Sequence, residues 1–141
     1  MSKDIHNQID VVRSIAPVAK TTVAATVGKV VDRNGYEGVE FIIAYGSITA
    51  TDATLTPIIK EGDVTGTMTS VADADLLGTE AGAGIAAGAR TSNSNKNVAK
   101  RIGYIGSKRY VSCSITSTVT AATIVSANVL LSNPRTMPVA T

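Results

Sequence analysis

The sequence predicts an all-β, single-domain protein whose body is β-sandwich or jelly-roll-like. The chain has 141 residues, which suits one hydrophobic core and is short for two. Aromatic residues make up 4% of the chain and hydrophobic residues 44%, so Val, Ile, Ala and Thr must fill the core. β-Branched side chains pack well on pleated strands. Short alternating segments joined by turns with Gly or Asn are typical of sandwiches.

The first twenty residues are expected to form an extended N-terminal arm outside the core. Their apolar residues recur every three or four positions, as on one face of a short helix, and Pro17 ends any helix there. This stripe could cover the domain's own sheet or a neighbouring protein. If it is a contact arm, deletion of residues 1–17 leaves a folded domain. The candidate contact residues of the arm are Ile5, Ile9, Val12, Arg13 and Ile15.

Residues 21–132 are expected to form the sandwich body. The turn at residues 32–35 contains Asn-Gly, which favours positive φ. Pro57 indicates an edge or a bulge, because proline cannot donate to a strand ladder. A helical turn or hydrophobic plug is expected at residues 72–77, and ordered chain resumes at residues 100–106. Strands are expected at residues 21–31, 39–48, 54–61, 67–71, 108–119 and 121–132.

Two further segments are predicted to lie outside the regular sheets. Residues 79–97 are rich in Gly, Ala, Ser and Asn, which indicates a flexible loop or an extended contact arm. Residues 133–141 form a C-terminal tail in which Pro134 and Pro138 prevent pairing as a central strand.

The charges are divided along the chain. Residues 1–80 contain six Lys/Arg and all eleven Asp/Glu, whereas residues 81–141 contain seven Lys/Arg and no acid. The halves should therefore pair internally or, if they form separate faces, allow copies to associate head to tail.

Four basic residues in the second half are candidate partner contacts. Gly103 and Gly106 are expected to bend the chain so that two basic pairs meet in one patch. An acidic protein surface is favoured over phosphates, because interleaved aromatics and nucleic-acid motifs are lacking. Alternatively, these cations pair with Glu37, Glu40 or Asp75. The four residues are Lys100, Arg101, Lys108 and Arg109.

The residue inventory argues against catalysis and against a bound cofactor or metal. His6 is the only histidine and lies in the arm, while Cys113 is the only cysteine and is expected to be a buried small hydrophobe. Carboxylate pairs such as Asp73/Asp75 are interpreted as solvated turns. Membrane insertion is not expected, because no segment approaches the roughly 20 apolar residues that span a bilayer.

Four segments resemble a known protein class along nearly the full length of the chain. They are Ile9–Pro17 (IDVVRSIAP), Ala74–Gly78 (ADLLG), Arg101–Val111 (RIGYIGSKRYV) and Asn133–Arg135 (NPR). Together they resemble small structural proteins of tailed bacteriophages that are encoded near the major capsid protein.

The resemblance implies a virion component that is made in the host cytoplasm, and the preferred role is capsid decoration, or cement. Such a protein would bind the major capsid protein on the outer surface of the head and stabilise contacts between capsomers, typically as a homotrimer. A head-completion (head-tail connector) or tail-tube protein is one alternative. A surface carbohydrate-binding module is another, although it would need exposed aromatic platforms.

Overall fold

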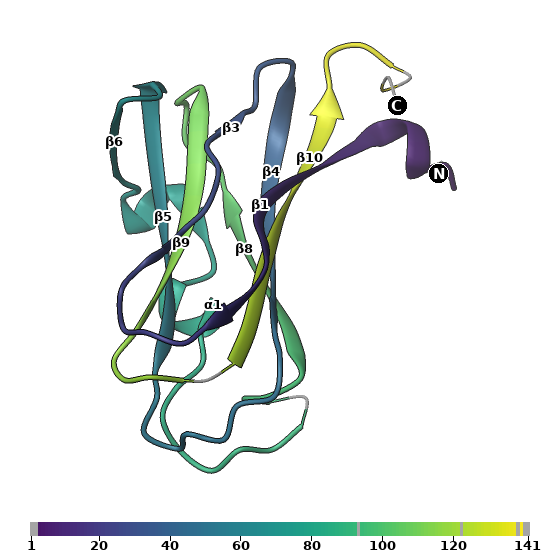
Figure 1. Cartoon of the computed structure of the whole chain (residues 1–141). Helices are drawn as coiled ribbons and strands as arrows, with labels where there is room; N and C mark the ends of the chain where they lie inside the picture. Colours follow the sequence, from purple (N-terminus) through teal and green to yellow (C-terminus); the bar gives the residue numbers. More distant parts are fainter. Residues whose placement is uncertain (1–2, 93, 122, 138, 140–141) are drawn as a thin grey trace.

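Two antiparallel sheets packed face to face confirm the all-β sandwich prediction (Figure 1). The computed structural model describes residues 3–92, 94–121, 123–137 and 139. Sheet A has the strand order β1 (Ile9–Lys20), β10 (Thr123–Pro134), β4 (Tyr36–Tyr45), β8 (Val98–Tyr104) and β7 (Leu76–Leu77). Sheet B has the order β2 (Thr26–Val27), β9 (Tyr110–Ser117), β5 (Leu55–Val64) and β6 (Thr67–Ser70), and β3 (Val31–Asp32) also pairs with β9.

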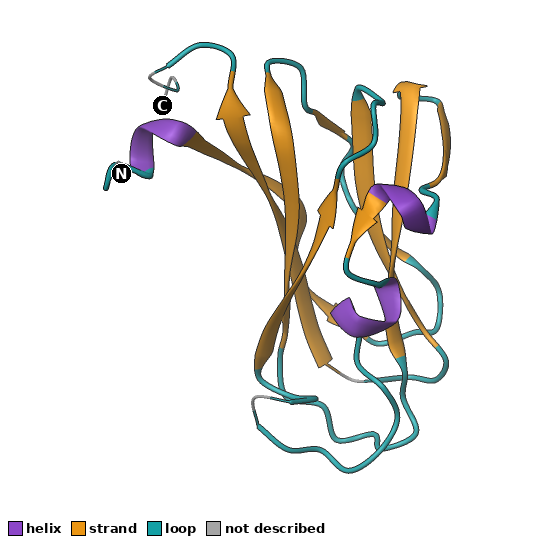
Figure 2. Cartoon of the chain, turned by 180° about the vertical axis from the view of Figure 1, so that it is seen from behind, coloured by secondary structure: helices purple, strands orange, loops and turns teal. Residues whose placement is uncertain are grey.

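Within the described residues, the structure has three short helical segments. They lie between or before the strands (Figure 2). The 3-10 turn η1 (His6–Gln8) precedes β1, and η2 (Asp73–Asp75) falls within the predicted helical turn or plug at residues 72–77. The helix α1 (Glu80–Ala83) follows β7, with the Thr79 side chain accepting a hydrogen bond from the Gly82 amide as an N-cap.

The core consists mainly of aliphatic side chains from the inner faces of the two sheets. Phe41, Ile43, Ile59 and Ile115 are fully buried there. The alternation of β4, β9 and β10 supplies this face, as the period-two pattern of their sequences predicted. Cys113 is also fully buried, as predicted, and burial raises the pKa of its thiol to about 12.

The expectation that residues 1–20 lie outside the core is wrong for residues 9–20, which form the edge strand β1 of sheet A. Its pairing with β10 shifts register between Arg13 and Ile15 and again between Ile15 and Val18. Each shift inserts one extra residue, so Val12, Ile15 and Val18 pair with alternate residues of β10 although they are three apart. These irregularities gave the strand the spacing of a helix.

The segment 79–97 was predicted to be a flexible loop or contact arm. Its described residues are hydrogen-bonded to their own domain, and Asn93 lies outside the described residues. Ile85 is buried and exchanges two backbone hydrogen bonds with Leu55. The Arg90 guanidinium donates to the carbonyl oxygens of Ala50, at 2.9 Å from Nε, and Ala53, at 2.7 Å. Long-range contacts that composition cannot reveal therefore order this segment.

Pro57 lies at an open stretch of β5, as its chemistry predicted. The neighbouring strand β6 pairs only with β5 residues from Lys60 to Val64. Beyond β6, the Ile59 amide donates to Oε1 of Glu80 at 2.8 Å. A carboxylate therefore replaces the missing strand next to the proline.

Replacement of Ile15 by alanine should destabilise the domain by about 2–5 kcal/mol, because the Ile15 side chain is 3% exposed and packs in the core. Val18→Ala on the same strand is the matched control and should cost under about 1 kcal/mol, since Val18 is 41% exposed. Urea unfolding followed by circular dichroism measures both. Equal, small effects would show that residues 9–20 do not belong to the folded core.

Candidate partner-binding surfaces

The outer face of sheet A is rich in apolar side chains that point away from the core. Strand register places Val11, Leu130, Glu40, Gly103 and Leu77 in one row across all five strands. Val11 is 59% exposed and Leu77 is 55% exposed.

The neighbouring rows mix apolar side chains with polar ones. The next row contains Arg13, Asn128, Ile42 and Arg101, and further along lie Ala44, Ala99 and the exposed Ile124. An antiparallel sheet that faces water normally carries polar residues on that side. We name these residues of the five strands the A face.

Glu40 lies at the centre of the A face and is partly shielded from water. Burial raises its pKa, while Arg101, whose Nε lies 3.8 Å from Oε1, acts in the opposite direction. Gly103 makes room for the carboxylate, because a Cβ atom there would lie 2.7 Å from Oε2 of Glu40. One acid and one base therefore form a weak pair in the middle of the A face.

The outer face of sheet B has a different chemistry. Its β5 and β9 positions carry hydroxyl groups, including those of Thr56, Ser112, Ser114 and Thr116. Val27 on the short strand β2 is 77% exposed, and Ile58 lies in the same row on the other side of Ser114. The two outer faces of the sandwich thus differ, because hydroxyl groups predominate on β9 whereas the A face carries Val11, Leu130 and Leu77 in one row.

The four basic residues predicted to form one patch are separated. Lys100 pairs in register with the inward-facing Ile43, whereas Arg101 lies on the A face. Lys108 is bound to Asp63 at 2.6 Å, and Arg109 binds Asp32 through Nε at 3.0 Å and Nη2 at 2.8 Å. Gly103 continues β8 instead of bending it.

These ion pairs join the two halves of the chain within one molecule, which was one of the two predicted outcomes. Each of the three ion pairs joins an acid before residue 81 to a base after it. Glu40 is one of the partners that the sequence suggested, while Asp32 and Asp63 are found in place of Glu37 and Asp75.

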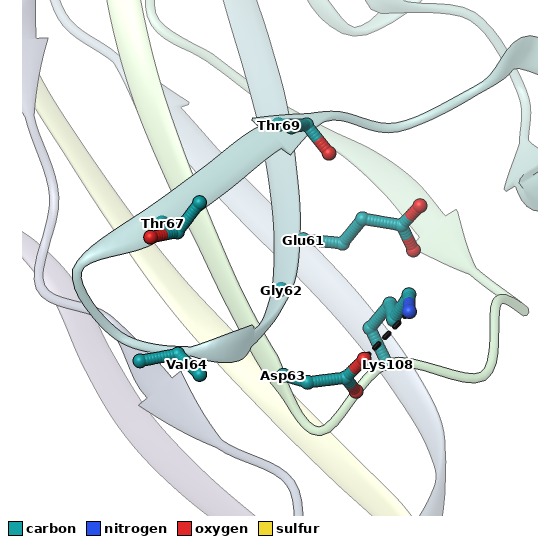
Figure 3. Close-up of a pocket in the computed structure, with 7 residues that line it drawn as sticks. All are labelled: Glu61, Gly62, Asp63, Val64, Thr67, Thr69 and Lys108. Carbon is teal, nitrogen blue, oxygen red and sulfur yellow. Dashed lines mark hydrogen bonds and ion pairs between the residues drawn. The ribbon is translucent and has the colours of Figure 1, made fainter.

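The Lys108–Asp63 pair lines a hollow at the end of β5, together with Glu61, Thr67 and Thr69 (Figure 3). Both carboxylates of this hollow accept hydrogen bonds. Oε2 of Glu61 accepts a hydrogen bond from the Tyr104 hydroxyl at 2.5 Å, and Asp63 accepts one from Lys108. These bonds tie the β5–β6 hairpin to the chain that leads from β8 into β9.

A second hollow, with a volume of about 150 Å³, collects three arginines at the end of the sandwich where β4 begins. We name Arg33, Arg109 and Arg135 the arginine cluster. Only Arg109 was among the residues selected from the sequence. Arg33 belongs to the predicted Asp32–Gly35 turn and Arg135 to the NPR segment, but nothing local indicates that these segments meet.

The first described residues, before β1, lie close to the segment that follows β10 (Figures 1 and 2). The Val139 amide donates to the Asn7 carbonyl oxygen at 3.1 Å. Ile5 is 66% exposed and Met137 is 61% exposed. Of the predicted arm, the described residues 3–8 lie beyond the sheet. Pro138, Ala140 and Thr141 of the predicted tail lie outside the described residues.

The predicted arm residues therefore have different positions. Ile5 precedes η1, and Arg13 belongs to the A face. Ile9 pairs with Ser132 on the same side of β1 as Val11, while Val12 and Ile15 face inward. Within the described ranges, no group of three or more His, Cys, Asp or Glu side chains is placed to hold a metal ion. The described helices are all too short and too polar to cross a membrane.

Comparison with protein-family models and with curated proteins finds no match to this chain.

The Asp32–Arg109 pair should make stability depend on pH. Hydrogen bonding from Arg109 lowers the pKa of Asp32 below its ordinary 3.8. The stabilisation is therefore present above that value and is lost as pH falls through the lower pKa of the folded state. Asp32→Asn should be less stable than wild type at pH 7 by a small amount, because the pair is partly exposed.

Urea unfolding at pH 7 and near pH 2 measures this difference, which should shrink in acid. Asp52→Asn, in the exposed turn between β4 and β5, is the control for removal of one carboxylate. A difference between wild type and Asp32→Asn that stays constant from pH 7 to pH 2 would contradict the assignment.

Proposed function

We propose that this chain is a virion structural protein that binds the outer surface of a tailed-phage head as a capsid decoration, or cement, protein. The A face is its proposed contact with the major capsid protein. The observation that carries the proposal is the row across sheet A that contains the apolar side chains of Val11, Leu130 and Leu77, with Val11 and Leu77 more than half exposed. Resemblance of four segments to phage structural proteins indicates the partner.

The A face suits a protein contact for physical reasons. Apolar surface removed from water contributes about 25 cal/mol per Å², and contiguous exposed apolar patches mark interaction sites. The strands that carry it are hydrogen-bonded on both sides or backed by the core, so little ordering is needed on binding. Weak contacts of this kind, repeated around a shell, add up through avidity.

The carbohydrate-binding alternative finds little support in the positions of the tyrosines. Tyr45 is 2% exposed and Tyr104 is 1% exposed, so neither offers a ring to a sugar. Tyr36 and Tyr110 are half-buried, and Tyr110 already lies under the Arg109 guanidinium. The head-completion or tail-tube alternative differs in stoichiometry, since it requires a ring where the decoration role favours a homotrimer.

Val11→Glu should weaken binding to shells assembled from the major capsid protein by about tenfold or more, because it places an unpaired charge in the proposed apolar contact. Val27→Glu is the matched control, since it makes the same substitution at an exposed valine of sheet B. Co-sedimentation with purified shells measures binding, and light scattering measures the mass of the free protein.

A homotrimer that sediments with shells, with binding reduced by Val11→Glu and kept by Val27→Glu, supports the proposal. Equal binding of both variants would remove the A face as the contact. A large ring that ignores the shells would favour the head-completion or tail-tube role.

A further inference from the structure

We propose that the arginine cluster is a carboxylate-binding site that takes an Asp or Glu side chain of the partner protein. The identity of this partner rests on the function proposed above. Arg33, Arg109 and Arg135 come from three distant segments of the chain and line one hollow with Asn34, Gly35, Tyr36 and Ser107. None of these lining residues is acidic.

Arg33 is held in a fixed position by the chain that connects β8 to β9. Its Nε donates to the Lys108 carbonyl oxygen at 2.5 Å and its Nη2 to the Gly106 carbonyl oxygen at 2.8 Å. Its guanidinium carbon also lies 5.4 Å from the centre of the Tyr104 ring. Neither hydrogen bond uses Nη1, so a rigid guanidinium keeps donor groups for a ligand.

Arg109 is fixed in a similar way. Asp32 accepts hydrogen bonds from Nε and Nη2, and the Tyr110 ring lies 5.1 Å from the guanidinium carbon. Asp32 also belongs to the turn that precedes β4. There its Oδ1 accepts a hydrogen bond from the Asn34 amide at 3.0 Å. Asp32 therefore balances one of the three cations and holds one side of the hollow in shape.

Arg135 is brought to the same place by strand pairing. β10 pairs with β4 as far as Pro134 and Tyr36, and the Arg135 amide then donates to the Gly35 carbonyl oxygen at 2.8 Å. Gly35 adopts a φ of +93°, which other residues rarely reach and which completes the turn. The Arg135 side chain is attached to this anchored backbone and is exposed.

The chemistry of the hollow fits a carboxylate. The three guanidinium groups have two carboxylates nearby, Asp32 bound to Arg109 and Asp10 bound to the Tyr36 side chain, so an excess of positive charge remains. Planar arginine donors match the two oxygens of a carboxylate. Nucleic acid would need a stripe of cations along several phosphates and aromatic rings for base stacking. Here the charge is confined to one small hollow, and the nearby Tyr104 and Tyr110 rings are already covered by arginines.

A titration of the isotope-labelled full-length chain with a hexaglutamate peptide, followed by NMR, tests the site. The backbone amides of Asn34, Gly35 and Ser107 should shift in a saturable way. Arg135→Ala should weaken the apparent affinity roughly tenfold, the value of about one charge-assisted hydrogen bond. Lys29→Ala removes one exposed positive charge elsewhere and is the control, which should bind the peptide as wild type does.

Several results would overturn the inference. These are an absence of saturable shifts at residues 34, 35 and 107, equal weakening by Arg135→Ala and Lys29→Ala, and saturation of these amides by inorganic phosphate but not by the peptide. The last result would assign the hollow to small anions instead of a protein side chain.

The same variants separate this inference from the proposed function. If the peptide binds at the cluster but wild-type protein ignores the shells, the carboxylate site stands and the decoration role fails. If the shells bind Arg135→Ala as tightly as Lys29→Ala, the decoration role stands and the carboxylate site is overturned.

Discussion

The position of β10 between β1 and β4 is the constraint on which the rest of the structure depends. β10 pairs with both neighbours along most of its length, and its inward residues Val125, Ala127, Val129 and Leu131 are buried. The first and last strands of the chain therefore lie side by side in sheet A, with β1 at its edge. Because β10 continues to Pro134, it also carries Arg135 to the turn before β4 and brings the tail to Asn7. One strand thus positions the core, the arginine cluster and the chain ends.

The division of charge along the sequence becomes intelligible in this topology. Pairing of β4 with β8, and of β5 and β3 with β9, places acids of the first half beside bases of the second. The three ion pairs that result are partly exposed, so each contributes little to the free energy of unfolding. Their larger effect is on the charge of the surface, because a paired side chain offers less charge to a partner than an unpaired one. The arginine cluster differs in that Asp32 compensates only one of its three cations.

Sequence periodicity predicted those parts of the fold whose spacing is regular. The strands expected at residues 39–48, 108–119 and 121–132 correspond to β4, β9 and β10, in which inward-facing core residues recur at every second position without a register shift. The sequence did not predict β1 because two irregularities change the spacing of its inward residues from two to three. It did not predict that residues 79–97 are ordered, because their order depends on hydrogen bonds from Ile85 and Arg90 to distant carbonyl groups. The arginine cluster was beyond sequence reasoning for a related reason, since only the register of β10 against β4 brings Arg135 to Arg33.

The difference between the two outer faces follows from the same strand order. The outward residues of β10 lie in the interior of sheet A, so Leu130 and Ile124 have neighbours on both sides and cannot fold back into the core. In the proposed function, the major capsid protein covers this face. A contact on this rigid sheet loses less conformational entropy than one made by a loop. The A face can thus supply affinity, while a charged contact at the arginine cluster would fix the orientation of the partner.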